Sequence, residues 1–229
     1  MNNLFIKIKN GLIVSCQSEG DDPFNSPEGV TLFAKAAFMG GAVAIRSEGI
    51  EKIRSIKKAV NLPIIGLLKS TFPDGYVRIT GSYHEVEQLL EAGCDMIAVD
   101  GTFRERERLN GPDFIERIKS RYSCMIMADI ATINEAFACE NSGADCISTT
   151  LNGYTPETIS KNKNPNFNII KQLVQKKMKI PVIAEGRINK PADAKRMLEN
   201  GAWAVVAGTA ITRPRVITQW YVNEINRKI

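Results

Sequence analysis

Eight short apolar runs recur along the chain, and segments with helical periodicity separate them. The runs lack the polar alternation of a half-exposed strand, which is typical of strands covered on both faces in a parallel sheet. They are Leu12–Cys16, Ala42–Ile45, Ile64–Leu68, Met96–Val99, Met125–Ala128, Cys146–Thr149, Val182–Ala184 and Ala204–Ala207. Eight successive strand–helix units without a linker predict a single (β/α)8 TIM barrel over residues 1–229. A doubly wound open sheet is the structural alternative.

The ends of four predicted helices share a signal, which is a glycine followed by a small residue and then the next apolar run. Glycine adopts the left-handed conformation beyond a helix at little cost, so we expect the chain to turn back there. These glycines are Gly41, Gly93, Gly143 and Gly201. We also expect an extra short strand at Tyr76–Thr80, and a loop at Gly153–Phe167 that is a candidate lid.

The composition restricts the possible functions. The formal net charge is +5, with lysine and arginine scattered, which favours steering of small anions over nucleic-acid binding. The five cysteines are widely spaced and form no Cys-x-x-Cys pair, so reduced thiols in the cytoplasm explain them best. We expect no signal peptide and no membrane span. A single histidine, His84, excludes histidine-based triads and multi-histidine metal sites, and no nucleotide-binding motif occurs.

The residue that follows each apolar run is nearly always polar. Active sites of TIM barrels lie at the carboxyl ends of the strands, so these side chains are expected to converge on one mouth. In chain order they are Gln17, Arg46, Lys69, Asp100, Asp129, Thr150, Glu185 and Gly208.

A lysine and a glutamate at two of these positions suit proton transfer. Burial of Lys69 in the mouth, beside a cation such as Arg46, would favour the neutral amine that acts as a base. Glu185 can transfer a second proton, or it can stay ionised and position Lys69. Arg46 suits a carboxylate or phosphate, and Asp129 can orient substrate hydroxyls. A purely structural ion pair among the arginine and the two acids is the alternative.

Small residues after the seventh and eighth runs favour a phosphate site. Gly186 and Arg187 follow the seventh run, and Gly208 and Thr209 follow the eighth, where barrels often hold phosphate on backbone N–H groups. Arg213 can add a side-chain contact. Two ordinary turns are the alternative. Together these features predict a phosphate-binding barrel that moves a proton on the carbon next to a carbonyl of a sugar phosphate.

At these residues the sequence resembles the N-acetylmannosamine-6-phosphate 2-epimerase family. The matching stretches span nearly the whole chain in order. They are Gly11–Gln17, Gly41–Arg46, Pro63–Lys69, Ile97–Thr102, Met127–Asp129, Ser148–Thr155, Val182–Arg187 and Gly208–Pro214.

The resemblance implies an isomerase of sialic acid catabolism that converts N-acetylmannosamine 6-phosphate into N-acetylglucosamine 6-phosphate without a metal or organic cofactor. It implies that Lys69 is the acid/base at C2 and that Glu185 is its partner. The residues expected to bind the sugar and its phosphate are Gln17, Arg46, Asp129, Thr150, Tyr154, Gly186, Arg187, Gly208, Thr209 and Arg213. The pattern leaves open whether one base or two carry the proton.

Two stretches depart from the family pattern. Ser70 stands where members usually carry arginine, and Phe103–Arg108 lacks the usual Arg-Pro, which concerns loop contacts and acyl preference. A Schiff-base aldolase that uses Lys69, another sugar-phosphate isomerase and a non-catalytic phosphosugar-binding barrel are the alternatives. The last helix carries Trp220 and Tyr221, which favours a homodimer over simple packing on the barrel.

Overall fold

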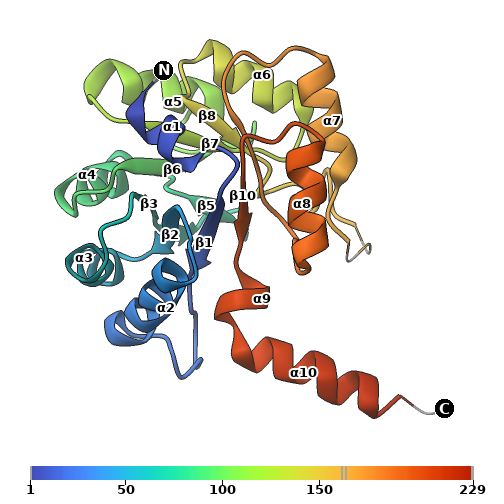
Figure 1. The fold of residues 1–229 in the computed structure, drawn as a ribbon. Coiled ribbons are helices and arrows are strands. Elements are labelled where there is room, and N and C mark those ends of the chain that lie inside the picture. The colour runs from blue at the N-terminus through green and yellow to red at the C-terminus, as the bar shows by residue number, and fades with distance from the viewer. Residues whose placement is uncertain (1, 161, 163, 228–229) are drawn as a thin grey trace.

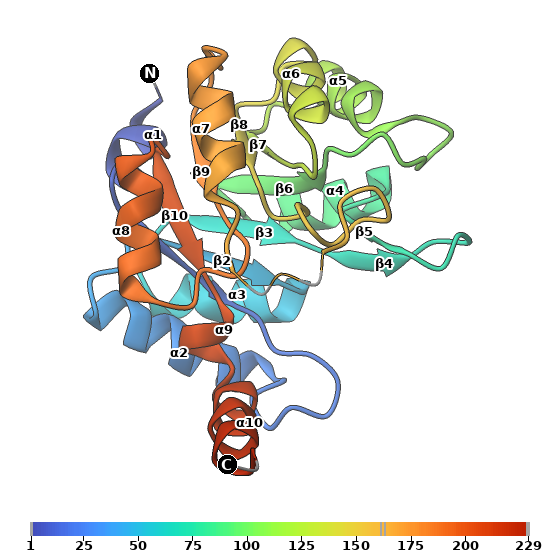
Figure 2. The same ribbon diagram turned by 90° about the vertical axis from the view of Figure 1, so that its right-hand side faces the viewer.

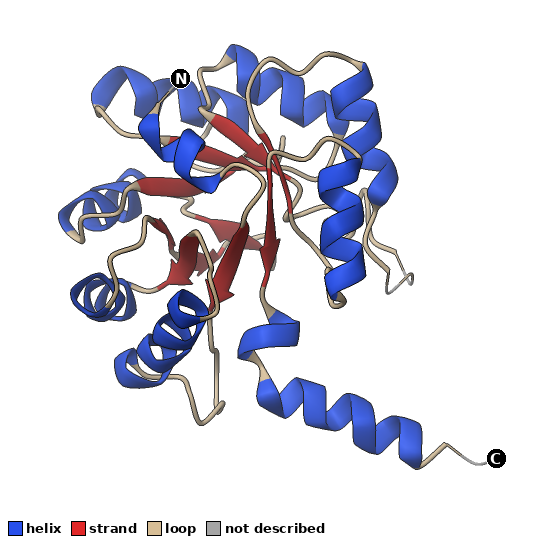
Figure 3. Cartoon of the chain, in the orientation of Figure 1, coloured by secondary structure: helices blue, strands red, loops and turns tan. Residues whose placement is uncertain are grey.

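The computed structural model describes residues 2–160, 162 and 164–227, and it confirms the predicted TIM barrel. Eight parallel strands close into a barrel in the order β1-β10-β9-β8-β7-β6-β3-β2, with helices arranged around it (Figures 1 and 3). The barrel strands are β1 (Leu12–Cys16), β2 (Ala44–Glu48), β3 (Ile64–Leu67), β6 (Met96–Asp100), β7 (Ile126–Asp129), β8 (Cys146–Ser148), β9 (Val182–Ala184) and β10 (Ala204–Ala207).

Helices lie between the successive barrel strands, as the segments with helical periodicity between the apolar runs predict. The four glycines expected to end helices all have positive φ, between 78° and 97°, as the turn back into the next strand requires. The helices are α1 (Asn3–Ile8), α2 (Pro27–Met39), α3 (Ile50–Ala59), α4 (Tyr83–Glu91), α5 (Gly111–Arg121), α6 (Ile133–Asn141), α7 (Phe167–Gln175), α8 (Pro191–Glu199), α9 (Thr209–Thr212) and α10 (Pro214–Ile225).

Alternation along the strands separates two hydrophobic clusters. On β6, Met96 and Ala98 belong to the cluster inside the barrel, and Ile97 belongs to the cluster between the barrel and the helices. Side chains alternate between the two faces of a strand, so Asp100 at the end of β6 also faces the barrel axis. Arg46 on β2 follows the same rule. This alternation brings polar side chains together at the carboxyl end of the barrel.

Helix α1 closes the opposite end of the barrel (Figure 2). Its buried residues Phe5 and Ile8 pack in the cluster inside the barrel. The indole Nε1 of Trp203 donates to the backbone oxygen of Phe5 at 2.9 Å. Within the described residues, α1 therefore covers the end of the barrel opposite the polar residues.

The third barrel strand is followed by a hairpin that extends beyond the carboxyl end of the barrel (Figure 2). The expected extra strand is present as β5 (Val77–Ile79), and it pairs antiparallel with β4 (Lys69–Thr71). Lys69 is opposite Ile79 in this hairpin. The prediction that Lys69 directly follows a barrel strand was wrong. The barrel strand β3 ends at Leu67, and Lys69 is the first residue of β4 in the hairpin.

The last helix projects away from the barrel (Figures 1 and 3). Pro214 starts α10 immediately after the short helix α9, and none of the residues of α10 is buried. In the described part of the chain, no helix is both long and apolar enough to cross a membrane.

Candidate active site

A pocket of about 670 Å³ opens at the carboxyl end of the barrel. Every predicted site residue lines it except Asp129. These lining residues are Gln17, Arg46, Lys69, Thr150, Tyr154, Glu185, Gly186, Arg187, Gly208, Thr209 and Arg213. The sequence pattern therefore located the pocket.

A buried ion-pair network forms the floor of the pocket. Arg46 donates from Nη1 to Asp129 Oδ1 at 2.9 Å and from Nη2 to Asp129 Oδ2 at 2.5 Å. Its Nη1 also lies 3.2 Å from Glu185 Oε2. The side chains of Arg46 and Asp129 are 1% and 0% exposed, whereas that of Glu185 is 14% exposed. Asp129 therefore lies behind Arg46, and Glu185 is the acid that the pocket reaches.

Two hydroxyl groups complete this network. Thr150 Oγ1 lies 2.6 Å from Asp129 Oδ1 and 3.0 Å from Glu185 Oε2, and Ser148 Oγ donates to Glu185 Oε2 at 3.3 Å. These contacts hold the glutamate in one orientation. The predicted site residue Thr150 thus bridges the two acids.

The pKa values of Glu185 and Arg46 are both raised in this network, but for different reasons. Burial raises the pKa of Glu185 above its ordinary value, and the nearby charge of Arg46 only partly opposes this effect. Burial also disfavours the charge on Arg46, but Asp129 and Glu185 together outweigh it and raise the pKa of the guanidinium. We therefore regard Arg46 as permanently charged, with Asp129 as its main counterion because the pair is bidentate. Glu185 is the group in the network that can hold a proton.

Lys69 lies on the wall of the pocket, where its Nζ pairs with Glu19. Its side chain is 31% exposed, so Lys69 is less buried in the mouth than expected, because the hairpin carries it to the rim. The same Glu19 oxygen lies 3.4 Å from Arg213 Nη2. Burial raises the pKa of Glu19, but Lys69 and Arg213 outweigh burial and hold it below its ordinary value.

Glu19 also lines the pocket, and it was missed by the sequence analysis. It stands two residues after Gln17, which itself stands two residues after Ser15, and all three line the pocket. Extending the strand alternation two residues past Gln17 would have found it.

The end of the pocket where the sequence predicts phosphate binding lies beside β9 and β10. Gly186 has φ of 113°, and Arg187 has φ of 57°. The guanidinium of Arg187 donates to Gly153 O at 2.9 Å and lies 4.3 Å from the ring centroid of Tyr154. A Cβ on Gly153 would lie 2.2 Å from Arg187 Nη1. Arg187 therefore ties the start of the candidate lid, Gly153–Phe167, to the pocket; residues 161 and 163 of this loop lie outside the described residues.

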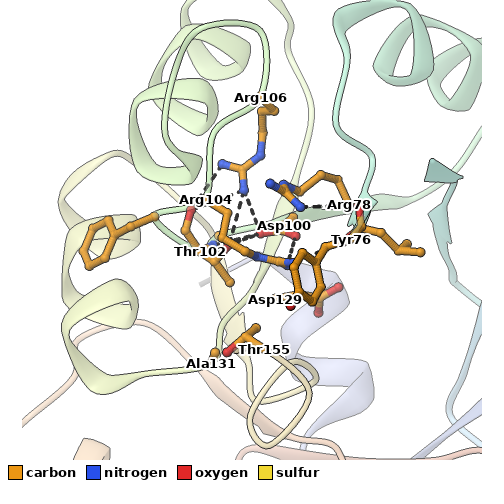
Figure 4. A network of polar contacts seen from close by, with 12 residues as sticks. Tyr76, Arg78, Asp100, Thr102, Arg104, Arg106, Asp129, Ala131 and Thr155 are labelled. Carbon is orange, nitrogen blue, oxygen red and sulfur yellow. Dashed lines mark hydrogen bonds and ion pairs between the residues drawn. The ribbon is translucent and has the colours of Figure 1, made fainter. Parts of the chain in front are cut away.

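A second polar network surrounds Asp100 at the end of β6 (Figure 4). Asp100 was expected at the mouth but does not line the pocket, and the arginines that surround it were missed. Arg104 Nη2 donates to Asp100 Oδ2 at 2.6 Å, and Arg106 Nη2 donates to Asp100 Oδ1 at 2.7 Å. Thr102 Oγ1 donates to the same carboxylate at 2.6 Å. Arg78 joins the hairpin to this loop by donating from Nε to Glu105 O at 3.2 Å. The sequence signal for this network was an apolar run that ends in an aspartate and is followed by an arginine-rich stretch.

Within residues 2–160, 162 and 164–227, no three His, Cys, Asp or Glu side chains gather closely enough to hold a metal ion.

The fold and the pocket together define a class, which is the TIM-barrel enzymes with a charged acid–base pocket for a small phosphorylated substrate. Comparison with known proteins specifies the family. The family model described as "Putative N-acetylmannosamine-6-phosphate epimerase" (NanE) matches residues 30–227, and the chain belongs to this family. The resemblance inferred from the sequence is thereby confirmed.

Individual relatives agree with this assignment. Proteins named "Putative N-acetylmannosamine-6-phosphate 2-epimerase" are 45% identical in Clostridioides difficile (96% of this chain, 97% of the relative) and 46% identical in Caldanaerobacter subterraneus (97% and 94%). The solved N-acetylmannosamine-6-phosphate 2-epimerase from Clostridium perfringens has a TM-score of 0.90 at 41% identity, covering 97% of this chain and 96% of its own. Thiamine phosphate pyrophosphorylase from Pyrococcus furiosus shares only the fold, with a TM-score of 0.63 at 18% identity over 98% of this chain and 100% of its own.

Proposed function

We propose that this chain interconverts N-acetylmannosamine 6-phosphate and N-acetylglucosamine 6-phosphate by moving the proton on C2, in sialic acid catabolism. The observation that carries the proposal is the placement of an amine and a carboxylate in one pocket. Lys69 follows β3 and Glu185 follows β9, and these strands lie opposite each other in the barrel. Two groups on opposite sides of one carbon suit the inversion of a stereocentre.

The C2 hydrogen is acidic only in the open-chain form of the sugar, where C1 is an aldehyde. After Lys69 has left its ion pair with Glu19 and given up its own proton to solvent, its amine takes the proton from C2, and the electron pair of the C–H bond forms the C1–C2 double bond of an enolate. Glu185 in its protonated form returns a proton to C2 from the other face, and the C1 carbonyl forms again. The raised pKa of Glu185 supports this role, because it increases the protonated fraction.

The remaining residues are assigned to binding and positioning. Arg46 holds Glu185 in place, and Asp129 balances the charge of Arg46 without touching the substrate. Gln17, Thr150 and Tyr154 contact the sugar. The residues assigned to the phosphate are Gly186, Arg187, Gly208, Thr209 and Arg213. Lys69 must leave its ion pair with Glu19 before it reaches C2.

The test is proton NMR of N-acetylmannosamine 6-phosphate with the protein in deuterated water. We expect the wild type to lose the C2 proton signal and to form the gluco epimer. Lys69→Ala should lose exchange and epimerisation together, whereas the control Lys58→Ala, an exposed lysine on α3, should behave as wild type. Lys69→Ala protein that exchanges the C2 proton at the wild-type rate would refute the assignment.

The same assay separates one base from two. If Glu185 supplies the second proton, Glu185→Gln protein should still exchange the C2 proton of the manno substrate through Lys69 but form no gluco product. If one base serves both faces, exchange and epimerisation would change in parallel in this variant.

We further propose that the chain acts as a homodimer in which α10 of one copy packs against the barrel of the other. In a TIM barrel the helix after the last strand normally covers the barrel beside the first helix pair, but here α10 points away. It exposes Trp220, Tyr221 and Ile225 at 43%, 69% and 77%, and α2 exposes Leu32 and Met39 at 60% and 86%. A contact between these surfaces would be isologous and would cover both.

Sedimentation velocity tests the dimer. Wild-type protein should sediment as a dimer, and Trp220→Glu/Tyr221→Glu protein as a monomer with unchanged circular dichroism. A monomeric wild type at micromolar concentration would contradict the proposal.

We place the protein in the cytoplasm, which the free thiols of Cys16, Cys94, Cys124, Cys139 and Cys146 support.

A further inference from the structure

The pocket has two chemically different ends. Gly186, Gly208 and Arg213 lie beside β9 and β10, whereas β3 and β6 lie across the barrel from them. In the proposed substrate the phosphate is on C6 and the N-acyl group is on C2, at the other end of the carbon chain. A substrate anchored by its phosphate beside β9 and β10 therefore extends its acyl group toward the wall next to β3 and β6.

That wall combines apolar side chains with one arginine. Tyr76, Val77 and Ile79 from the hairpin and Arg104 from the loop after β6 line it. Tyr76 and Val77 are 46% and 44% exposed, so they present apolar surface that no other described residue covers. Apolar surface next to a hydrogen-bond donor suits an amide-linked acyl group, which has a carbonyl oxygen and a hydrocarbon end.

Arg104 is held in one position and still has donors to spare. Its Nε donates to Thr102 Oγ1 at 3.0 Å, its Nη1 to Val77 O at 3.3 Å and its Nη2 to Asp100 Oδ2 at 2.6 Å. A guanidinium has five N–H groups, so two remain without a partner among the described residues. The side chain is only 11% exposed, which means that its conformation is set by the protein.

The charge of Arg104 is only partly balanced. Asp100 is fully buried and also pairs with the fully buried Arg106, so one carboxylate serves two guanidinium groups. Figure 4 shows Arg104 and Arg106 converging on Asp100. An unbalanced cation at this wall favours acyl groups that carry additional oxygen atoms.

We propose that Arg104 and the β4–β5 hairpin form the subsite for the N-acyl group on C2, and that Arg104 donates hydrogen bonds to the oxygen atoms of that group. The inference rests on the proposed epimerase function and adds the substrate class, which is N-acyl sugars whose acyl group carries oxygen. The N-glycolyl substrate, with its extra hydroxyl, is therefore a better substrate than the N-propanoyl one of similar size.

The experiment compares kcat/KM for N-acetyl, N-glycolyl and N-propanoyl mannosamine 6-phosphate. In the wild type the glycolyl-to-propanoyl ratio is expected to be on the order of tenfold or more, as for a hydrogen bond to a charged group. Arg104→Met should reduce this ratio by about the same factor, and Arg104→Lys should retain part of it. Arg108→Met removes an exposed arginine of the same loop and should leave the ratio unchanged.

The ratio is measured on one enzyme preparation, so it does not depend on the folded fraction of a variant. An unchanged ratio in Arg104→Met, with the N-acetyl substrate still epimerised by the wild type, would overturn the subsite and leave the proposed function intact. A wild-type chain inactive on all three compounds would overturn the proposed function and the subsite with it.

Discussion

The substitution Asp129→Asn tests the ion-pair network on the pocket floor. The change removes the charge from a fully buried carboxylate that accepts two hydrogen bonds from Arg46. Removing one partner of a buried ion pair generally costs about 3–5 kcal/mol, because the other charge stays buried without compensation. Here Glu185 remains 3.2 Å from Arg46 Nη1, so we expect a loss near the lower limit, about 3 kcal/mol.

The loss should be visible in both thermal and chemical denaturation. For a chain of this length, about 3 kcal/mol corresponds to a decrease of about 6–12 °C in Tm. Denaturation in urea, followed by circular dichroism, gives the free energy of unfolding and shows whether the slope with denaturant is unchanged. Glu51→Gln is the matched control, because its pair with Arg54 is 72% and 45% exposed, and it should cost less than about 1 kcal/mol.

A double-mutant cycle completes the test. If the cost arises from the uncompensated guanidinium, Asp129→Asn should cost much less in a background that already carries Arg46→Met. The interaction free energy should be in the range of about 0.5–3 kcal/mol that contacting pairs show. A loss from Asp129→Asn no larger than that of Glu51→Gln, or strict additivity with Arg46→Met, would refute the reasoning.

Three further predictions concern the rest of the pocket. Burial raises the pKa of Glu185 in the folded state, so this carboxyl stabilises the fold below its ordinary pKa of 4.5 and loses that contribution as the pH rises through the folded-state pKa. The free energy of unfolding of Glu185→Gln should therefore be at least as large as that of the wild type at pH 8. A stability advantage of Glu185→Gln that grows toward pH 4 would contradict this. Glu19→Gln should bind inorganic phosphate about two- to fivefold more tightly in calorimetry, because a partly exposed carboxylate no longer competes with phosphate for Arg213. Weaker phosphate binding in this variant would show that Glu19 instead helps to hold Arg213 in the binding position. Gly153→Ala should lower kcat/KM about tenfold. The backbone φ of 87° and the close approach of Arg187 both oppose a Cβ at this position, and holding a residue other than glycine in this conformation costs about 1–3 kcal/mol. Wild-type kinetics in this variant would rule the prediction out.

Strand periodicity made much of the fold and the site predictable. Each apolar run marked a barrel strand, and a polar residue at its end marked the pocket, because alternation along parallel strands turns the same side chains toward the axis. Lys69 was placed on the wrong element, since an extended run does not reveal where the barrel ladder stops and a hairpin ladder begins. Glu19 follows the alternation of β1 beyond the end of its apolar run, where hydrophobicity no longer marks the strand. Arg104 was missed because it lies on a loop, and contacts between loops depend on their folded conformation.

The site also shows the limits of local sequence patterns for electrostatics. Lys69 was expected beside Arg46, but the structure pairs it with Glu19, which follows a different strand. The pairing of Arg46 with Asp129 was considered only as an alternative, yet it is the closest ion pair of the pocket floor. The strands follow one another around the barrel in chain order, but which charges neutralise one another also depends on how far each side chain and each loop reaches beyond its strand end.

The hairpin that begins at Lys69 shares no ladder with the barrel strands, since β4 and β5 form a separate two-stranded sheet; side-chain bonds such as Arg78 to Glu105 O and Arg104 to Val77 O join it to the loop after β6. Parts of a protein that lie outside the main ladder can open at temperatures where the remainder stays folded. Amide hydrogens of this hairpin should therefore exchange with solvent faster than those of β3. Warming would then abolish turnover before the barrel melts, and cooling would restore it.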